Sequence, residues 1–156
     1  MYNKTGKRND CSGEQSNRSD SAGKKKTRID HHNYVDEAEN SIKRLKEKRG
    51  RNGKTVEMVS TSKIRNLLAM AADIYNVILN CDVDQLSEDI CERIEYLRVR
   101  FMYEAGREPK VKALLEETCI IELLKGVKGS KKNFILFQRY MESLVAFHRY
   151  YGGKEN

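Results

Sequence analysis

The sequence predicts an all-α protein, a compact bundle of about five helices with a disordered basic N-terminal tail. The 156 residues include a single proline, Pro109, and the near-absence of proline favours long uninterrupted helices. From Tyr34 onward, apolar residues recur every three or four positions, and no stretch alternates polar and apolar residues as a strand would. We therefore expect a tail at residues 1–33 and a helical-bundle domain at residues 34–156.

The tail is predicted from its composition. It contains only five hydrophobic residues, and most of the rest is Ser, Asn, Gly or charged. So few apolar side chains cannot offset the entropy that folding removes, so we expect disorder. Its eight basic and four acidic residues contribute +4 of the net charge of +7. Anion binding by the folded part must therefore be argued from where its charges lie.

The first two helices are predicted at residues 34–50 and 60–80. The first has acidic residues at its start and basic residues at its end, as the helix dipole prefers, and its inner face consists of Val35, Ala38, Ile42 and Leu45. The second has Ser62 as its predicted cap. Its inner stripe consists of Ile64, Leu67, Leu68, Ala71, Ile74, Tyr75 and Ile78.

The third helix is predicted at residues 86–106, with Ser87 as its cap and Gly106 at its end. Its inner stripe consists of Ile90, Ile94, Leu97, Phe101 and Ala105. Pro109 suits the first position of the next helix, and so short a connection predicts an antiparallel pair.

The last two helices are predicted at residues 109–126 and 130–153. The former is the least regular, because Glu122 falls on the same line as the apolar residues at its start, and we expect the buried face to shift toward Ile121 and Leu124. The latter is the most apolar. Its inner face consists of Phe134, Phe137, Met141, Leu144, Val145 and His148.

A second stripe lies beside the core stripe of the third helix. Arg93, Tyr96, Arg100 and Tyr103 recur at steps of three and four, and Arg107 follows. Arginine presents paired donors to phosphate, and tyrosine presents a flat face with a polar tip, so the stripe suits a nucleic-acid backbone or single-stranded bases. In the alternative, the tyrosines border the core and the arginines form a solvated face.

Other basic residues lie where a helix dipole disfavours them. Lys63 follows the Ser62 cap, and Lys131 and Lys132 follow Ser130. Bases at a helix start, together with free backbone N–H groups, favour anion binding; the alternative is that exposed lysines tolerate the small cost. On the outer face of residues 60–80, Arg65 has small neighbours that leave room for a nucleic-acid backbone, although good helix formers on a solvated surface look the same.

The sequence offers little support for catalysis. His148 lies on an apolar face, where a core role is the better interpretation, and no nucleophile elbow, phosphate loop or metal motif is present. The four cysteines lack metal-site spacing, which indicates reduced thiols in the cytoplasm. The chain shows neither an apolar leader nor a run long enough to span a membrane. We expect no enzyme activity, cofactor or metal.

Three ordered motifs carry a family resemblance. "TSKIRNLLAM" (61–70), "VRFMYEAGR" (99–107) and "KKNFILFQRYMESLVAFHRYYGG" (131–153) closely resemble the small helical subunit of type III-A CRISPR effector complexes, the Csm complex. The resemblance covers about residue 34 to the end, and nothing is carried over to the tail. It implies an all-α subunit without catalytic residues that serves RNA-guided antiviral defence.

The resemblance also implies partners and contacts. Copies of the subunit stack into a filament beside a backbone filament that holds the guide RNA, and they mainly touch the target RNA. Cleavage of target RNA belongs to the backbone subunit, whereas DNA cleavage and cyclic oligoadenylate synthesis belong to the large subunit. The basic positions of the family fall here on Lys63, Arg65, Arg100, Arg107 and Arg139.

Two hypotheses follow for the function. In the first, the chain contacts the RNA backbone independently of sequence, because guide pairing already reads the sequence. The candidate contacts are then Lys63, Arg65, Arg93, Arg100, Arg107, Lys131, Lys132 and Arg139. In the second, the chain is a structural adaptor whose arginines bind neighbouring subunits and barely touch RNA.

Overall fold

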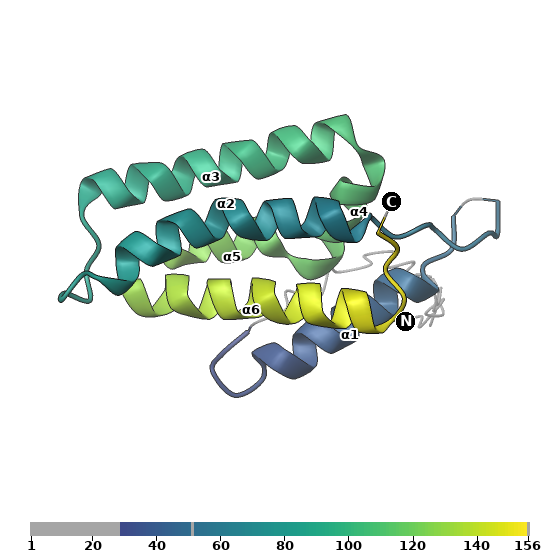
Figure 1. Ribbon diagram of the computed structural model, residues 1–156, viewed down its shortest axis with the longest axis horizontal. Helices are drawn as coiled ribbons and strands as arrows, with labels where there is room; N and C mark the ends of the chain where they lie inside the picture. Colours follow the sequence, from purple (N-terminus) through teal and green to yellow (C-terminus); the bar gives the residue numbers. More distant parts are fainter. Residues whose placement is uncertain (1–28, 51, 156) are drawn as a thin grey trace, which may run out of the picture.

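The computed structural model describes residues 29–50 and 52–155, which form six α-helices and no strand (Figure 1). The all-α prediction is confirmed, with one helix more than expected. Of the predicted tail, residues 1–28 lie outside the described part, while residues 31–33 form a turn and Ile29 packs against the core. The helices are α1 (Tyr34–Glu47), α2 (Thr61–Leu79), α3 (Glu88–Arg107), α4 (Pro109–Thr118), α5 (Ile120–Val127) and α6 (Lys131–Tyr150).

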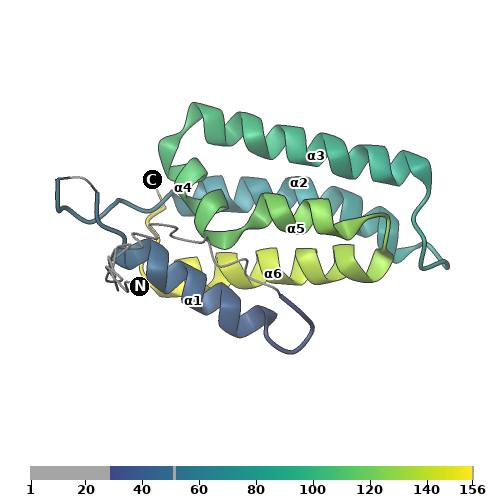
Figure 2. The same cartoon turned by 180° about the vertical axis from the view of Figure 1, so that it is seen from behind.

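The long helices α2, α3 and α6 lie side by side, and α1 packs across α6 and α4 (Figures 1 and 2). The chain reverses after α3, so α5 runs back beneath it, as the short connection predicted. Since α2 runs opposite to α3 and α6, the start of α2 lies at the same end of the bundle as the last turns of α3 and α6. This end carries several of the predicted contact residues.

The centre of the bundle is aromatic. Phe134, Phe137 and Tyr140 of α6 are fully buried with Phe101 of α3. Several predicted inner residues lie at the edges instead: Val35 is exposed, and four others are only partly buried, namely Leu68, Tyr75, Ile121 and Val145. The expectation that residues 130–153 form the most apolar helix is wrong, because α2 and α5 hold a larger share of apolar residues. The central helix is nevertheless α6, since α1, α2 and α5 pack against it.

Two of the three helix caps follow the sequence prediction. Ser87 and Ser130 cap α3 and α6, each hydroxyl accepting the N–H of the residue three positions on. The prediction for α2 is wrong, since Ser60 rather than Ser62 accepts from the Lys63 N–H, at 3.3 Å. The correction moves the start of the helix two residues toward the N-terminus.

The end of α3 also differs from the prediction. Gly106 lies within the helix, which continues through Arg107 and is closed by Glu108 in an extended conformation, with φ of −134°. The residue before a proline is pushed out of the helical region, so Pro109 ends α3 as well as starting α4.

The predicted helix at residues 109–126 is divided in two. Cys119 adopts a left-handed conformation, with φ of 53°, between α4 and α5. The break changes the phase of the buried face, so that Ile120 and Leu124 turn inward while Glu122 stays exposed. The interrupted chain leaves the Thr118 carbonyl without a helical partner, and the buried Tyr140 hydroxyl donates to it at 3.2 Å.

Two features bear on the other sequence expectations. Within residues 29–50 and 52–155, none of the helices has the length and apolar composition that a bilayer span requires. Cys81, Cys91 and Cys119 are free thiols, whereas Cys11 lies outside the described residues.

Candidate nucleic-acid interface

The arginine and tyrosine stripe of α3 faces solvent along its whole length. Arg93, Arg100 and Arg107 are exposed, and Tyr96 and Tyr103 are 62% and 57% exposed. The tyrosines therefore do not border the core, as the alternative reading required. Two large flat side chains and three guanidinium groups share one accessible helix face.

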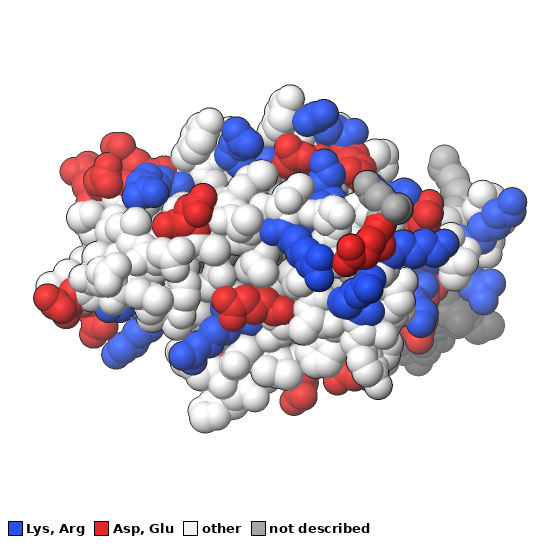
Figure 3. All heavy atoms as spheres, in the orientation of Figure 1, with Lys and Arg blue, Asp and Glu red and all other residues white. Residues whose placement is uncertain are grey.

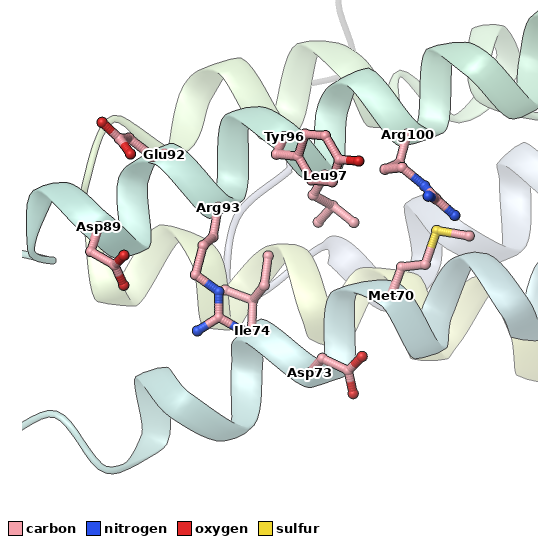
Figure 4. Close-up of a pocket in the computed structure, with 9 residues that line it drawn as sticks. All are labelled: Met70, Asp73, Ile74, Asp89, Glu92, Arg93, Tyr96, Leu97 and Arg100. Carbon is pink, nitrogen blue, oxygen red and sulfur yellow. The ribbon is translucent and has the colours of Figure 1, made fainter.

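Arg93 and Arg100 also line a groove between α2 and α3. Figure 4 shows both side chains extending from α3 toward α2, Arg93 beside Ile74 and Arg100 beside Met70. The groove has a volume of about 470 Å³, and Asp73, Asp89 and Glu92 also line it. Within the described part of the chain, neither arginine has a carboxylate within 4 Å of its nitrogens. Both guanidinium groups can therefore donate hydrogen bonds to an external anion.

Arg107, at the end of the stripe, has neighbours on its own helix. Its guanidinium lies 5.5 Å from the centre of the Tyr103 ring and 3.8 Å from the Glu104 carboxylate. Glu104 is buried, and its other oxygen lies 3.2 Å from Lys63 Nζ at the start of α2. Lys63 Nζ also lies 3.7 Å from Oε2 of Glu108, so two carboxylates already balance its charge.

Arg65 lies at the same end of the bundle and has an unexpected partner. Its Nη1 is 3.1 Å from Oε1 of Glu155, in the segment after α6. The same oxygen lies 3.8 Å from Nη1 of Arg149, on the last turn of α6. One carboxylate thus joins arginines from two helices.

The predicted residues of α6 behave differently from one another. Lys131 donates from Nζ to the carbonyl of Cys81, which ties the start of α6 to the end of α2. Lys132 is exposed and 3.6 Å from the equally exposed Asp84. Arg139 is exposed near the middle of the helix, with no ion pair to any described residue.

The eight candidates therefore do not form a single patch. Lys63, Arg65 and Arg107 lie at the end where α2 begins, whereas Lys131 and Lys132 lie at the opposite end. Figure 3 shows basic side chains gathered near the C-terminus, with acidic ones among them, and a largely uncharged area over α2. The outer face of α2 is accessible there: Ala69 and Asn76 are exposed, and Ala72 is half-buried.

Three charged residues of this region escaped the sequence analysis. Glu104 could have been found, because it lies seven positions after the buried Leu97 and so falls on the core line of α3. Arg149 and Glu155 carry no such local signal. Their role depends on a contact with Arg65, 90 residues away from Glu155 in sequence.

His148 has the structural role that the sequence predicted. It is buried, its Nε2 lies 2.8 Å from the Val59 carbonyl, and burial lowers the pKa of its imidazole. Its Nδ1 is buried and has no hydrogen-bond partner among the described residues. Among the described residues, no three His, Cys, Asp or Glu side chains gather as metal ligands do. The absence of catalysis and of cofactors stays a prediction.

Comparisons with known proteins agree on one family. Residues 36–154 match the Csm2 Type III-A family. The chain is 41% identical over 123 residues to the CRISPR system Cms protein Csm2 of Streptococcus thermophilus, covering 79% of this chain and 94% of that one. It is 38% identical over 122 residues to the protein of the same name from Enterococcus italicus, covering 76% and 87% respectively. The Mycobacterium tuberculosis protein is 33% identical over 97 residues, covering 62% and 78%.

Proposed function

The chain belongs to the Csm2 family, the small subunit of the type III-A CRISPR complex, and from this membership we propose that it binds RNA through sequence-independent backbone contacts. The exposed stripe of α3 carries the proposal. Arg93 and Arg100 supply guanidinium groups that form no ion pair with any residue the structure describes, and Tyr96 and Tyr103 supply faces on which bases can stack. Base pairing with a guide RNA would supply the sequence specificity that such contacts lack.

The internal partners divide the eight candidates. Arg93, Arg100, Arg107 and Arg139 are the contacts that we assign to RNA phosphates, with Lys132 as a more remote one. Lys63 and Lys131 mainly hold elements together, because each already binds oxygens of a neighbouring helix or loop. Arg65 needs the release of Glu155 before it can bind an external anion.

We further propose that the chain works inside the cell as a non-catalytic part of the effector complex, in antiviral defence. Its partners are then the target RNA, the guide RNA, the backbone and large subunits, and further copies of itself along a filament. Cleavage chemistry belongs to other subunits in this proposal. The buried His148, bonded to a backbone carbonyl, is poorly placed to act as a general base.

A second candidate function, the structural adaptor, is favoured by apolar side chains beside the stripe. Val99 and Met102 are exposed on α3, and Met102 borders a groove of about 690 Å³. Ala105, Leu115 and Ile121 also line this groove, and charged residues surround it. This surface suits protein contacts, and we expect neighbouring subunits to bind there whether or not the stripe binds RNA.

The substitution Arg100→Ala tests the RNA-backbone proposal. Binding of a labelled single-stranded RNA to the full chain is measured by fluorescence anisotropy over a range of salt concentrations. For single strands, the slope of log affinity against log salt changes by ~0.7 for each phosphate neutralised. Arg100→Ala should therefore weaken binding and flatten the slope by about that amount, to a similar extent for RNAs of different sequence.

Arg98→Ala is the matched control. Arg98 lies on the same helix and carries the same charge, but it lies off the stripe and is paired with Glu95 at 2.7 Å. Its loss should leave the slope nearly unchanged. Equal affinities and slopes for wild type and Arg100→Ala would sink the RNA proposal for this stripe. The adaptor function predicts instead that Arg100→Ala impairs co-purification with the other subunits.

A further inference from the structure

Arg65 and Arg149 come from different helices but converge on one carboxylate. Oε1 of Glu155 lies 3.1 Å from Arg65 Nη1 and 3.8 Å from Arg149 Nη1. Carboxylate and phosphate oxygens accept the same paired donors from a guanidinium group. The position that Glu155 occupies is therefore one that a phosphate oxygen can occupy.

The segment that carries Glu155 is seated on the bundle by backbone contacts. The carbonyl of Lys154 accepts from the N–H of Thr61 at 2.8 Å, which satisfies a free donor at the start of α2. Gly153 donates its N–H to the His148 carbonyl at 2.9 Å. Gly153 packs so closely that a Cβ atom there would lie 2.2 Å from the His148 ring. The backbone is therefore fixed beside Arg65.

The side-chain contact, in contrast, is open to exchange. The side chains of Arg65 and Arg149 are each 55% exposed, and that of Glu155 is 52% exposed. Ion pairs this accessible are screened by solvent and contribute little stability. A tethered carboxylate still competes well, because the fixed backbone keeps its local concentration high.

We propose that Arg65 and Arg149 form an anion site for a phosphate of the RNA backbone, and that the Glu155 carboxylate occupies this site in the free protein. RNA must then displace Glu155, so the segment after α6 lowers the affinity for RNA until a phosphate takes its place. The inference rests on the proposed RNA binding, and it adds Arg149 to the contacts and gives Glu155 a regulatory role.

The substitution Glu155→Gln tests the inference in the full chain, with the RNA-binding assay described above. Removing the competing charge should raise the affinity about two- to fivefold, the range that corresponds to one exposed ion pair. Glu57→Gln is the matched control, because Glu57 is an exposed carboxylate that is paired with Lys110 at 2.7 Å and, among the described residues, makes no ion pair with Arg65 or Arg149. Glu57→Gln changes the net charge by the same amount as Glu155→Gln, but it should raise the affinity for RNA clearly less.

A second comparison shows whether Glu155 acts through the two arginines. In a chain that carries Arg65→Ala and Arg149→Ala, the added Glu155→Gln change should raise the affinity no more than Glu57→Gln does. Equal gains for Glu155→Gln and Glu57→Gln, or a gain that persists without the arginines, would overturn the inference and leave the proposed function intact. Absence of salt-dependent RNA binding by wild type and all variants would overturn both.

Discussion

At the scale of single residues, His148 shows how burial turns an ionisable group into a structural one. The ring lies between α6 and the segment before α2, with Nε2 at the Val59 carbonyl and Gly153 against its edge. Charging a buried imidazole is costly, and here burial lowers its pKa despite the favourable backbone hydrogen bond. The folded chain therefore holds His148 neutral at pH values where the unfolded chain binds a proton.

This difference predicts a loss of stability in weak acid. The unfolded histidine titrates near pH ~6.5, and the folded one titrates lower. The contribution of neutral His148 is thus complete above about pH 6.5 and is lost as the pH falls through the folded pKa. Between the two pKa values, the free energy of unfolding should fall by up to about 1.4 kcal/mol per pH unit. Urea unfolding at several pH values measures this slope.

Carboxylates also titrate in acid, so a variant must isolate the contribution of His148. His148→Gln should be less stable than wild type at neutral pH, but its stability should depend less on pH between about 7 and 5. The same slope in wild type and His148→Gln would show that His148 is not its source.

The sequence predicted the role of His148 because its position on an apolar helix face fixes its burial. It could not predict which groups pair with each charge. Lys63 was interpreted as a free base at a helix start, yet it reaches across to Glu104 on α3, 41 residues away. Pairs of this kind depend on how helices pack, and apolar spacing within one helix contains no information about its partner.

At the scale of elements, periodicity located every helical stretch, but it missed some boundaries and the division between α4 and α5. Ser60 rather than Ser62 starts α2, because the N–H of Thr61 is bound by the Lys154 carbonyl from the far end of the chain. The sequence indicated the break at Cys119 only indirectly, because an unbroken helix would place Glu122 on the buried face. The left-handed residue that resolves the conflict is a non-glycine residue, so no glycine marked the site.

A second left-handed residue predicts a stabilising substitution. Lys128 follows α5 with φ of 47° and is exposed. A left-handed conformation costs a non-glycine residue about 1–2 kcal/mol, whereas glycine loses about 0.5–1 kcal/mol more through entropy. Lys128→Gly should therefore raise the free energy of unfolding by roughly 0.5–1 kcal/mol, as measured by urea denaturation.

Lys125→Gly is the control for this substitution, because it removes the same charge from within α5. Glycine inside a helix should lower the free energy of unfolding by about 1 kcal/mol. If the free energy of unfolding rises for Lys128→Gly and falls for Lys125→Gly, the backbone conformation of Lys128 is the cause. A decrease for both would mean that Lys128 pays no conformational cost.

At the scale of the whole molecule, the arrangement of the helices was the part that the sequence left open. Five inner faces predicted a bundle, but they did not specify that α6 lies between α1, α2 and α5. The groove between α2 and α3 and the convergence of Arg65 and Arg149 on Glu155 both follow from that arrangement. The α3 stripe could be predicted from spacing alone because it lies on a single helix.

Because positive charge is unevenly distributed along the chain, RNA affinity could depend either on the net charge or on where the basic residues lie. Residues 1–33 carry +4 of the total of +7, but the proposed contacts lie on α3. One full-length variant replaces Arg93, Arg100 and Arg107 by Ala, and another replaces Lys24, Lys25 and Lys26 by Ser, so each lowers the net charge from +7 to +4.

If position governs binding, the α3 variant should flatten the salt slope by about two, the sum of three contacts at ~0.7 each, and the Lys24–26 variant should change it much less. Anisotropy titrations over a salt series measure both slopes. Equal flattening would mean that net charge governs RNA binding, and a larger effect of the lysine variant would move the interface from α3 to the N-terminal residues.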